Sequence, residues 1–215
     1  MTRTSLQADD RVAHGVVFVL VFAGVLLIPP LRRWPWVWLA PLLGYFALVV
    51  SLPRLRRSLS WLRTGKISAA SLAATLGVAG ATALTLALFR ATTEPDVASY
   101  SAALPFESLG GVIMAGIIFT MVNATLEELV FRGILFDALE SQWGARFTLV
   151  VTALLFGVGH LRGYPSGFAG AGLAVGFGLV TGGLRLWSGG LVLPVLAHLG
   201  ADATIYIILV RAGVE

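Results

Sequence analysis

Long apolar runs, separated by short polar or basic connections, make up most of the chain. A helix needs about 20 mostly apolar residues to cross the hydrocarbon core of a bilayer, and most of these runs approach or reach that length. We therefore predict membrane-spanning helices at residues 12–31, 34–52, 67–89, 108–126, 147–160, 167–184 and 191–210. The expected fold class is all-α, a polytopic transmembrane helical bundle of about seven spans.

The first run could instead be a signal peptide, because basic residues precede it. No A-x-A-like cleavage site follows Ile28, and the chain continues into Pro29, Pro30 and two arginines. We therefore predict that this run is a helix of the protein itself.

The composition agrees with a membrane protein. The 215 residues are 57% hydrophobic and 12% charged, whereas soluble domains usually carry about 25% charged residues. We expect a single integral membrane domain over residues 1–215 and no sizeable soluble domain. The chain has no cysteine, which excludes disulfides, a thiolate nucleophile and cysteine-based metal sites.

The formal charge of +4 does not indicate nucleic-acid binding, because most lysines and arginines lie between apolar runs. With a cytoplasmic N-terminus, nine of them would lie on the cytoplasmic side and five on the other, with Arg132 left out of the count. The positive-inside rule therefore favours that orientation. The basic residues within 54–66 predict a segment that lies at the cytoplasmic interface.

A small set of ionisable residues lies in or at the ends of apolar runs in the C-terminal half. Burying such a group at the centre of a bilayer costs roughly 3 kcal/mol on insertion scales, so these side chains face the protein interior and usually mark function. They are Glu127, Glu128, Arg132, His160, His198 and Asp202. His14, near the basic N-terminus, is predicted to be an interfacial histidine.

The spacing of the first three residues separates the two glutamates. Glu128 and Arg132 are four positions apart on a helix, so they can pair and lower the cost of burying each other. Glu127 is rotated by about 100° from Glu128 and is less easily neutralised by Arg132. We expect Glu127 to be free to act as a base that activates water.

The two histidines and Asp202 allow more than one interpretation. His198 and Asp202 are four positions apart, so they could be a buried pair that holds two helices together. His160 ends an apolar run, where a lone histidine is more often a satisfied interfacial residue than a ligand. However, two histidines and two or three carboxylates on three separate apolar runs can meet only at one interior site.

Residues 163–190 contain ten glycines, including Gly172-x3-Gly176 and Gly178-x3-Gly182. Small residues four positions apart let membrane helices approach closely. We expect tight packing of the sixth predicted helix, and the alternative is close packing around a site.

Three short motifs carry a resemblance to a known family. Glu127-Glu128-x3-Arg132, Phe156-x3-His160 and His198-x3-Asp202 occur in this order on successive apolar runs. They resemble the motifs of the CPBP family, the CAAX-prenyl-endopeptidase and bacteriocin-processing intramembrane proteases. The resemblance covers about residues 108–209. It implies a catalytic core at residues 107–211, preceded by N-terminal spans at residues 12–106.

The resemblance also implies roles for these residues in an all-helical intramembrane endopeptidase. Glu127 and His160 would activate a water molecule, and His198 with Asp202 would polarise the scissile carbonyl or stabilise the oxyanion. The structural or supporting residues would be Glu128, Arg132 and Phe156.

Asp202 departs from the family pattern, because many members carry Asn at this position. An ionised Asp cannot donate a hydrogen bond to an oxyanion, so Asp202 must be protonated, orient His198 or bind a metal. We expect no cofactor and a metal-free mechanism, since the chain has no H-E-x-x-H helix. The alternative is a zinc site at His160, His198 and Asp202 with water in the fourth position.

Water is the expected nucleophile, because Ser141, Ser166 and Ser188 lack a Gly-x-Ser-x-Gly context. The predicted function is hydrolysis of a peptide bond in a membrane-embedded or lipid-proximal substrate. The expected partners are a peptide or protein substrate and the lipid bilayer, without nucleic acid. An ion- or proton-coupled transporter, with the same residues as a relay, and a non-catalytic membrane scaffold are the alternatives. Fourteen arginines to one lysine suggest a GC-rich bacterial genome, and hence the bacterial inner (cytoplasmic) membrane.

Overall fold

The computed structural model is all-helical, as expected, and describes residues 3–93, 95, 97–102, 104–106 and 108–214. The α-helices are α1 Arg3–Leu26, α2 Trp36–Ser51, α3 Pro53–Arg57, α4 Ala69–Thr93, α5 Ala98–Ser101, α6 Leu109–Glu128, α7 Phe136–Gly159, α8 Gly167–Ser188 and α9 Val192–Val214. A 3-10 helix, η1, covers Pro29–Arg32, and a π-helical segment, η2, covers Leu129–Leu135.

Four helical stretches in the described part of the chain are long and apolar enough to cross a membrane. They are Ala69–Thr93, Leu109–Gly159, Gly167–Ser188 and Val192–Val214. The second stretch contains both α6 and α7, and therefore two of the predicted spans. Helix α2 is apolar but has only 16 residues, so membrane crossing by α1 and α2 stays a prediction.

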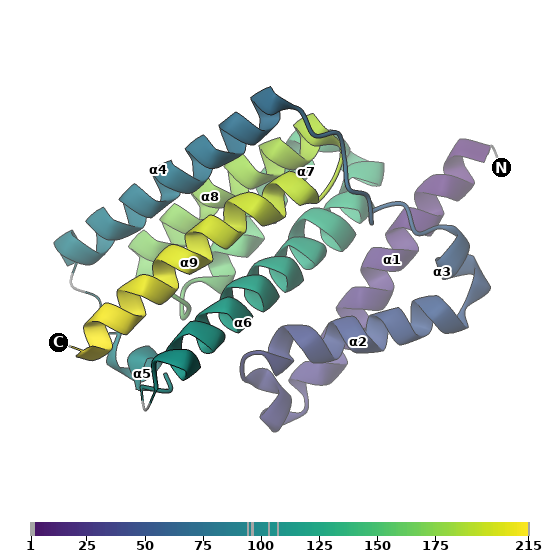
Figure 1. The fold of residues 1–215 in the computed structure, drawn as a ribbon. Helices are drawn as coiled ribbons and strands as arrows, with labels where there is room; N and C mark the ends of the chain where they lie inside the picture. Colours follow the sequence, from purple (N-terminus) through teal and green to yellow (C-terminus); the bar gives the residue numbers. More distant parts are fainter. Residues whose placement is uncertain (1–2, 94, 96, 103, 107, 215) are drawn as a thin grey trace.

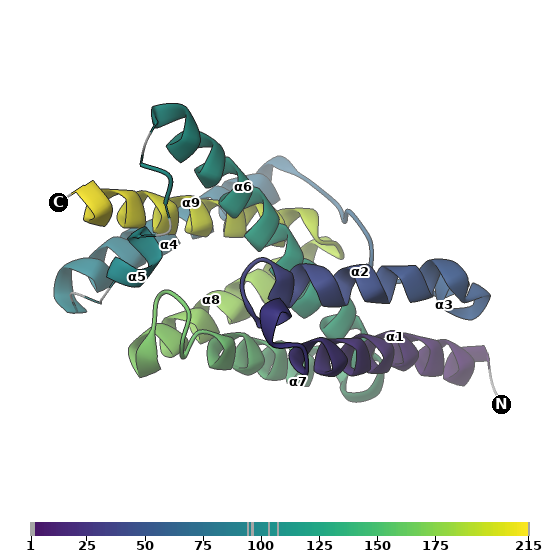
Figure 2. The ribbon, with the colours of Figure 1, turned by 90° about the horizontal axis from the view of Figure 1, so that it is seen from below.

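The helices form a large bundle with a smaller group of helices at one side (Figure 1). Helix α9 packs against α4, α6 and α8, and α7 packs along α8. Helices α1, α2 and α3 form the smaller group, and α1 runs alongside α7 (Figure 2). The two ends of the chain lie at opposite ends of the molecule (Figure 1).

The predicted spans at residues 108–126 and 147–160 belong to one longer helical path. Helix α6 passes into η2, and η2 passes into α7. The backbone at Gly144 is not helical, so the helix that follows this break begins close to residue 147, the predicted start of the fifth span. The path bends at Gly144, whose φ of 76° is a conformation that glycine adopts readily.

The first span also ends earlier than predicted. Helix α1 ends at Leu26, and the chain then enters η1 at Pro29 and Pro30. Proline lacks the N–H that a continuing helix needs. Residues 27–31 are therefore a turn and the start of η1.

Two buried side chains in the N-terminal half make polar contacts that were not predicted. His14, expected at the interface, is buried, with Nδ1 2.6 Å from Oη of Tyr45 and Nε2 3.1 Å from Oγ of Ser58. In the 54–66 segment, whose position at the cytoplasmic interface stays a prediction, Trp61 is completely buried and donates an indole hydrogen bond of 2.8 Å to Tyr45. These polar contacts join residues that are far apart in the sequence. They allow Tyr45 and Trp61 to be part of the hydrophobic core.

Trp61 also joins the smaller group of helices to the bundle. Its ring fills the space beside Gly133, where an added Cβ would lie only 2.6 Å from a ring carbon. Real Cβ atoms do not approach so closely, so this position of η2 requires glycine. The contact fixes the turn that carries Arg132.

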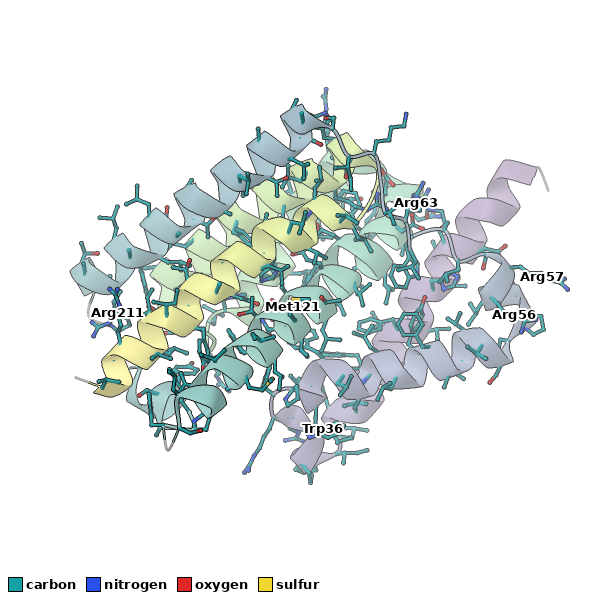
Figure 3. All side chains as sticks on the ribbon, in the orientation of Figure 1. Trp36, Arg56, Arg57, Arg63, Met121 and Arg211 are labelled. Carbon is teal, nitrogen blue, oxygen red and sulfur yellow. The ribbon has the colours of Figure 1, made fainter. Side chains whose placement is uncertain are left out.

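Basic residues mark one end of the molecule and also bind it together. Arg56, Arg57 and Arg63 lie toward the end opposite to Arg211 (Figure 3). Among these, Arg63 has Nη2 3.4 Å from Oδ1 of the buried Asp137 in α7. Arg11 and Ser60 bind the same carboxylate, at 2.9 and 2.6 Å. Charges that the sequence assigned to membrane orientation therefore also hold α1 and the 58–68 connection against α7.

Candidate functional site

A cavity of about 1390 Å³ lies between α4, α6, α8 and α9. All four residues expected to be catalytic line it: Glu127 at the end of α6, His160 after α7, and His198 and Asp202 in α9. Most of the remaining lining is apolar. The structure thus brings these four side chains together at one interior site.

Glu128 and Arg132 lie behind this cavity and form the ion pair that their spacing predicted. Nη1 of Arg132 is 3.1 Å from Oε1 of Glu128, and both side chains are at most 1% exposed. In addition, Glu128 Oε1 lies 2.7 Å from Nδ1 of His198. Glu128 is therefore a partner of two residues, and not only of Arg132 as the sequence indicated.

The contact with Glu128 determines how His198 is oriented. A carboxylate that pairs with Arg132 only accepts hydrogen bonds, so Nδ1 of His198 carries a proton. The other nitrogen, Nε2, lies 3.6 Å from Oε2 of Glu127 and 3.6 Å from Oδ1 of Asp202. His198 therefore donates a hydrogen bond to Glu128 on a neighbouring helix. Asp202, which lies on the same helix as His198, is close enough for an ion pair but not for a hydrogen bond.

One carboxylate oxygen of Glu127 is in ion-pair range of His198 but makes no hydrogen bond with a described residue. Its side chain is buried, and within the described ranges Oε2 has no hydrogen-bond partner. A buried oxygen without a donor is costly, so a substrate or water molecule that donates to it would be bound well. Glu127 lines the cavity, while Glu128 and Arg132 lie outside its lining.

His160 presents its second ring nitrogen as an acceptor. Nδ1 lies 2.9 Å from the carbonyl oxygen of Phe156, and a carbonyl only accepts, so Nδ1 carries the proton. Neutral His160 therefore has a lone pair on Nε2. The ring is held against Phe156, with ring centroids 4.5 Å apart.

Phe156 packs against several groups of the site, which fits the supporting role expected for it. The guanidinium carbon of Arg132 lies 4.6 Å from its ring centroid, a cation–π distance. Its ring also contacts His198 edge to face, with centroids 5.8 Å apart. Truncation of Phe156 would remove packing from both histidines and from the buried arginine.

Sequence reasoning missed two polar residues around Arg132. The Arg132 guanidinium donates to Oγ1 of Thr181 in α8. Nε of the buried Arg185 donates to the backbone oxygen of Arg132 at 3.0 Å. Arg185 could have been found, because an arginine that ends an apolar, glycine-rich run has to be satisfied inside the protein or at the interface. Instead, Arg185 was counted among the nine basic residues expected on the cytoplasmic side.

Asn123 was also missed. It lies in the apolar α6, lines the cavity, and its Nδ2 donates to Oδ2 of Asp202 at 3.2 Å. The signal was present in the sequence, because an amide four positions before Glu127 shares a helix face with it. A rule based on ionisable side chains alone passes over such an uncharged amide.

The two Gly-x3-Gly pairs of α8 have different surroundings. An added Cβ at Gly178 or Gly182 would lie 3.0 or 2.4 Å from side chains or backbone of α7, which agrees with the expected tight packing. Gly172 and Gly176 line the cavity, and an added Cβ there would meet open space. The first pair allows helices to pack, while the second pair leaves room in the cavity.

The donor set does not fit the zinc site that the sequence left open. His160, His198 and Asp202 line one cavity, but no group of three or more His, Cys, Asp and Glu side chains among the described residues is arranged to hold a metal ion. Nδ1 of His198 and Nδ1 of His160 have acceptors, as zinc ligands usually do. The two histidines and Asp202 do not converge on one point as metal ligands must.

A comparison with known families covers all seven residues of the three motifs. Residues 109–204 match the family model described as type II CAAX prenyl endopeptidase Rce1-like. The matched stretch begins with α6, ends within α9 and includes all seven motif residues, while α1 to α5 lie outside it. Neither the curated proteins nor the solved structures contain a significant match to the chain. Residues 109–204 are thus a domain of the Rce1-like type II CAAX prenyl endopeptidase (CPBP) family, a family of proteases.

Proposed function

We propose that the protein is an intramembrane endopeptidase that hydrolyses a peptide bond of a membrane-embedded or lipid-proximal substrate with an activated water. The observation that carries the proposal is the convergence of Glu127, His160, His198 and Asp202 on one largely apolar cavity. The protease family of residues 109–204 favours hydrolysis over a transporter or a scaffold.

In the proposed reaction, water binds between Glu127 and His160. Nε2 of His160 accepts one hydrogen bond and orients the water, while Oε2 of Glu127 takes its proton as the oxygen adds to the scissile carbonyl. The tetrahedral intermediate then collapses, and Glu127 returns the proton to the leaving amine nitrogen. The products are a carboxylic acid and an amine, which become carboxylate and ammonium when the acid proton passes to the amine, and Glu127 is restored.

His198 is the proposed electrophilic group. Its Nδ1–H is held by Glu128, so a proton on Nε2 would point into the cavity and could donate to the carbonyl oxygen as negative charge develops there. Asp202 accepts a hydrogen bond from Asn123, which supports a role as a partner of His198 and not as an oxyanion donor. Of the three roles left open for Asp202, orientation of His198 is the one that we propose.

We further propose one membrane domain over residues 1–215, with N-terminal spans at 12–106 and a catalytic core at 107–211. Seven crossings would place the termini on opposite sides of the membrane, which agrees with their positions at opposite ends of the molecule (Figure 1). Arg56 and Arg57 would then mark the cytoplasmic end (Figure 3). The bacterial cytoplasmic membrane is the proposed location, from the excess of arginine over lysine.

Comparative proteomics of membrane-protein termini tests the function. Cells with the wild-type protein should contain new termini within or beside apolar segments, and cells with Glu127→Gln should lack them. Purified wild-type protein in liposomes should then cleave peptides that span those sites. Identical termini in both strains would contradict the protease. Ion flux into the liposomes that depends on Glu127 would favour the transporter.

Filling the cavity should weaken substrate binding without unfolding the protein. In Gly176→Leu, the new side chain would project into the cavity from an open position of α8. We expect kcat/KM to fall by about 10-fold or more, through KM, since one extra methylene in an apolar pocket already has an effect of this size. Gly183→Leu is the matched control, because it is on the same helix, meets open space and lies outside the cavity lining. Equal kcat/KM in the two variants would contradict a role of the cavity in substrate binding.

Metal chelation should leave activity unchanged, because the described carboxylates and histidines are not grouped to hold a metal ion. Purified protein would be treated with 1,10-phenanthroline and EDTA, and its metal content would be measured by elemental analysis. We expect full turnover after treatment. Loss of activity that returns on addition of zinc, with stoichiometric zinc in the active protein, would overturn the metal-free mechanism.

A further inference from the structure

A hydrogen-bonded chain of three side chains runs into the site from outside the family domain. Nε1 of Trp34, in the connection between η1 and α2, donates to Oδ1 of Asn123 at 3.0 Å. Nδ2 of Asn123 then donates to Oδ2 of Asp202 at 3.2 Å. Both Trp34 and Asn123 line the cavity.

Trp34 determines which end of the Asn123 amide faces the carboxylates. An indole N–H can only donate, so the group that faces Trp34 must be the carbonyl oxygen of Asn123. The NH₂ group must therefore face the opposite direction, toward Asp202. Glu127 lies one turn further along α6, on the same face of the helix as Asn123.

The reverse orientation of the amide would be unfavourable for the reaction. It would place the carbonyl oxygen of Asn123 against Asp202 and Glu127, and three acceptors without a donor repel one another. Both carboxylates would move away from their positions 3.6 Å from Nε2 of His198. A displacement of about 1 Å in a catalytic group can cost about 10²-fold in rate.

We propose, on the basis of the proposed function, that Trp34 and Asn123 are a positioning pair that aligns the base Glu127 and the histidine partner Asp202. Trp34 holds the amide in one orientation, and Asn123 donates to Asp202 and turns its NH₂ group toward the carboxylates, with Glu127 one turn along the same helix face. Trp34 precedes the family domain at residues 109–204, so the N-terminal part of this chain completes the site of its C-terminal part.

The substitution Trp34→Phe removes the indole N–H and keeps an aromatic ring against Phe119, whose centroid is 5.7 Å away. We expect kcat to fall about 10-fold with little change in KM, since a hydrogen bond in this network is lost while the cavity stays open. Trp36→Phe is the control, because Trp36 is an exposed residue at the start of α2 (Figure 3) and its indole makes no hydrogen bond to another described residue. Its kcat and melting temperature should equal those of the wild type.

A double-mutant cycle separates positioning from general stability. Asn123→Ala should lower kcat about 10- to 100-fold, and Trp34→Phe should cost nothing further in that background, because Trp34 acts only through Asn123. Asn123→Ser replaces the alanine variant if that protein does not accumulate. The substrate is an internally quenched fluorogenic peptide that spans a cleavage site found by the proteomic comparison.

The outcomes distinguish this inference from the proposed function. Full turnover by both single variants, or two effects that simply multiply in the double variant, would overturn the positioning pair and leave the protease intact. A wild-type protein that cleaves no better than Glu127→Gln would overturn the proposed function, and the positioning pair with it.

Discussion

Glutamine in place of Glu127 is expected to abolish peptide cleavage while the protein stays folded. A positioned general base contributes about 10²- to 10⁴-fold to rate, and this base is proposed to accept and return the same proton. Glutamine keeps the size of the side chain but cannot accept that proton. Oε2 of Glu127 has no hydrogen-bond partner among the described residues and only a long contact of 3.6 Å with Nε2 of His198, so the substitution breaks no hydrogen bond at this oxygen.

Turnover of the fluorogenic peptide in liposomes and the melting temperature in detergent would be measured together. Glu140→Gln is the matched control, because Glu140 pairs with Arg11 at 2.8 Å, away from the cavity. It should retain full activity. A Glu127→Gln enzyme within about threefold of the wild type would show that the base lies elsewhere, since even a weak general base contributes about 10²-fold.

The helical fold and the composition of the site could be predicted because both depend on local sequence. Apolar runs of membrane length identify helices directly, and each predicted span overlaps a helix of the structure. The rarity of charge in these runs pointed to Glu127, His160, His198 and Asp202. Ionisable side chains inside a membrane protein face its interior and pair with one another. Such residues on three separate apolar runs were therefore expected to share one site.

The partners of these residues could not be predicted in the same way. Spacing of four identified the Glu128–Arg132 pair, but the bond between Glu128 and His198 joins residues 70 positions apart. The helical period says which side chains share a face, not which faces meet across a bundle. The contacts of His14 and Trp61 could not be predicted for the same reason, because both bind Tyr45, which lies in α2 and far from each of them in the sequence.

Helix ends were the other source of error. The π-helical η2 continues the path from α6 to α7, so the helix extends well beyond residue 126, the predicted end of the fourth span. The charges of Glu128 and Arg132 in this stretch are satisfied inside the protein, so they do not interrupt the helix. Polar residues indicate a loop only where water is the available partner.

Removal of one partner from the buried pair is the second large expected effect, this time on stability. Glu128→Ala leaves the Arg132 guanidinium, at most 1% exposed, without its carboxylate, and Arg132→Ala leaves the buried Glu128 without the arginine that balances its charge, although its contact with His198 stays. Each is expected to lower the free energy of unfolding by about 3 to 5 kcal/mol. Thermal denaturation in detergent and the expression level would report the loss. Wild-type melting temperatures in both variants would contradict a structural pair.

The double variant Glu128→Gln with Arg132→Met separates the two tasks of Glu128. It contains no unpaired buried charge, so most of the lost stability should return. The amide oxygen of the introduced glutamine can still accept the Nδ1–H of His198, which keeps the ring in place. An amide cannot balance positive charge on that ring when Nε2 donates to the oxyanion, so kcat should remain low although the fold is restored. Recovery of both stability and turnover would mean that Glu128 serves the fold alone, and that the charge it places behind His198 has no part in the reaction.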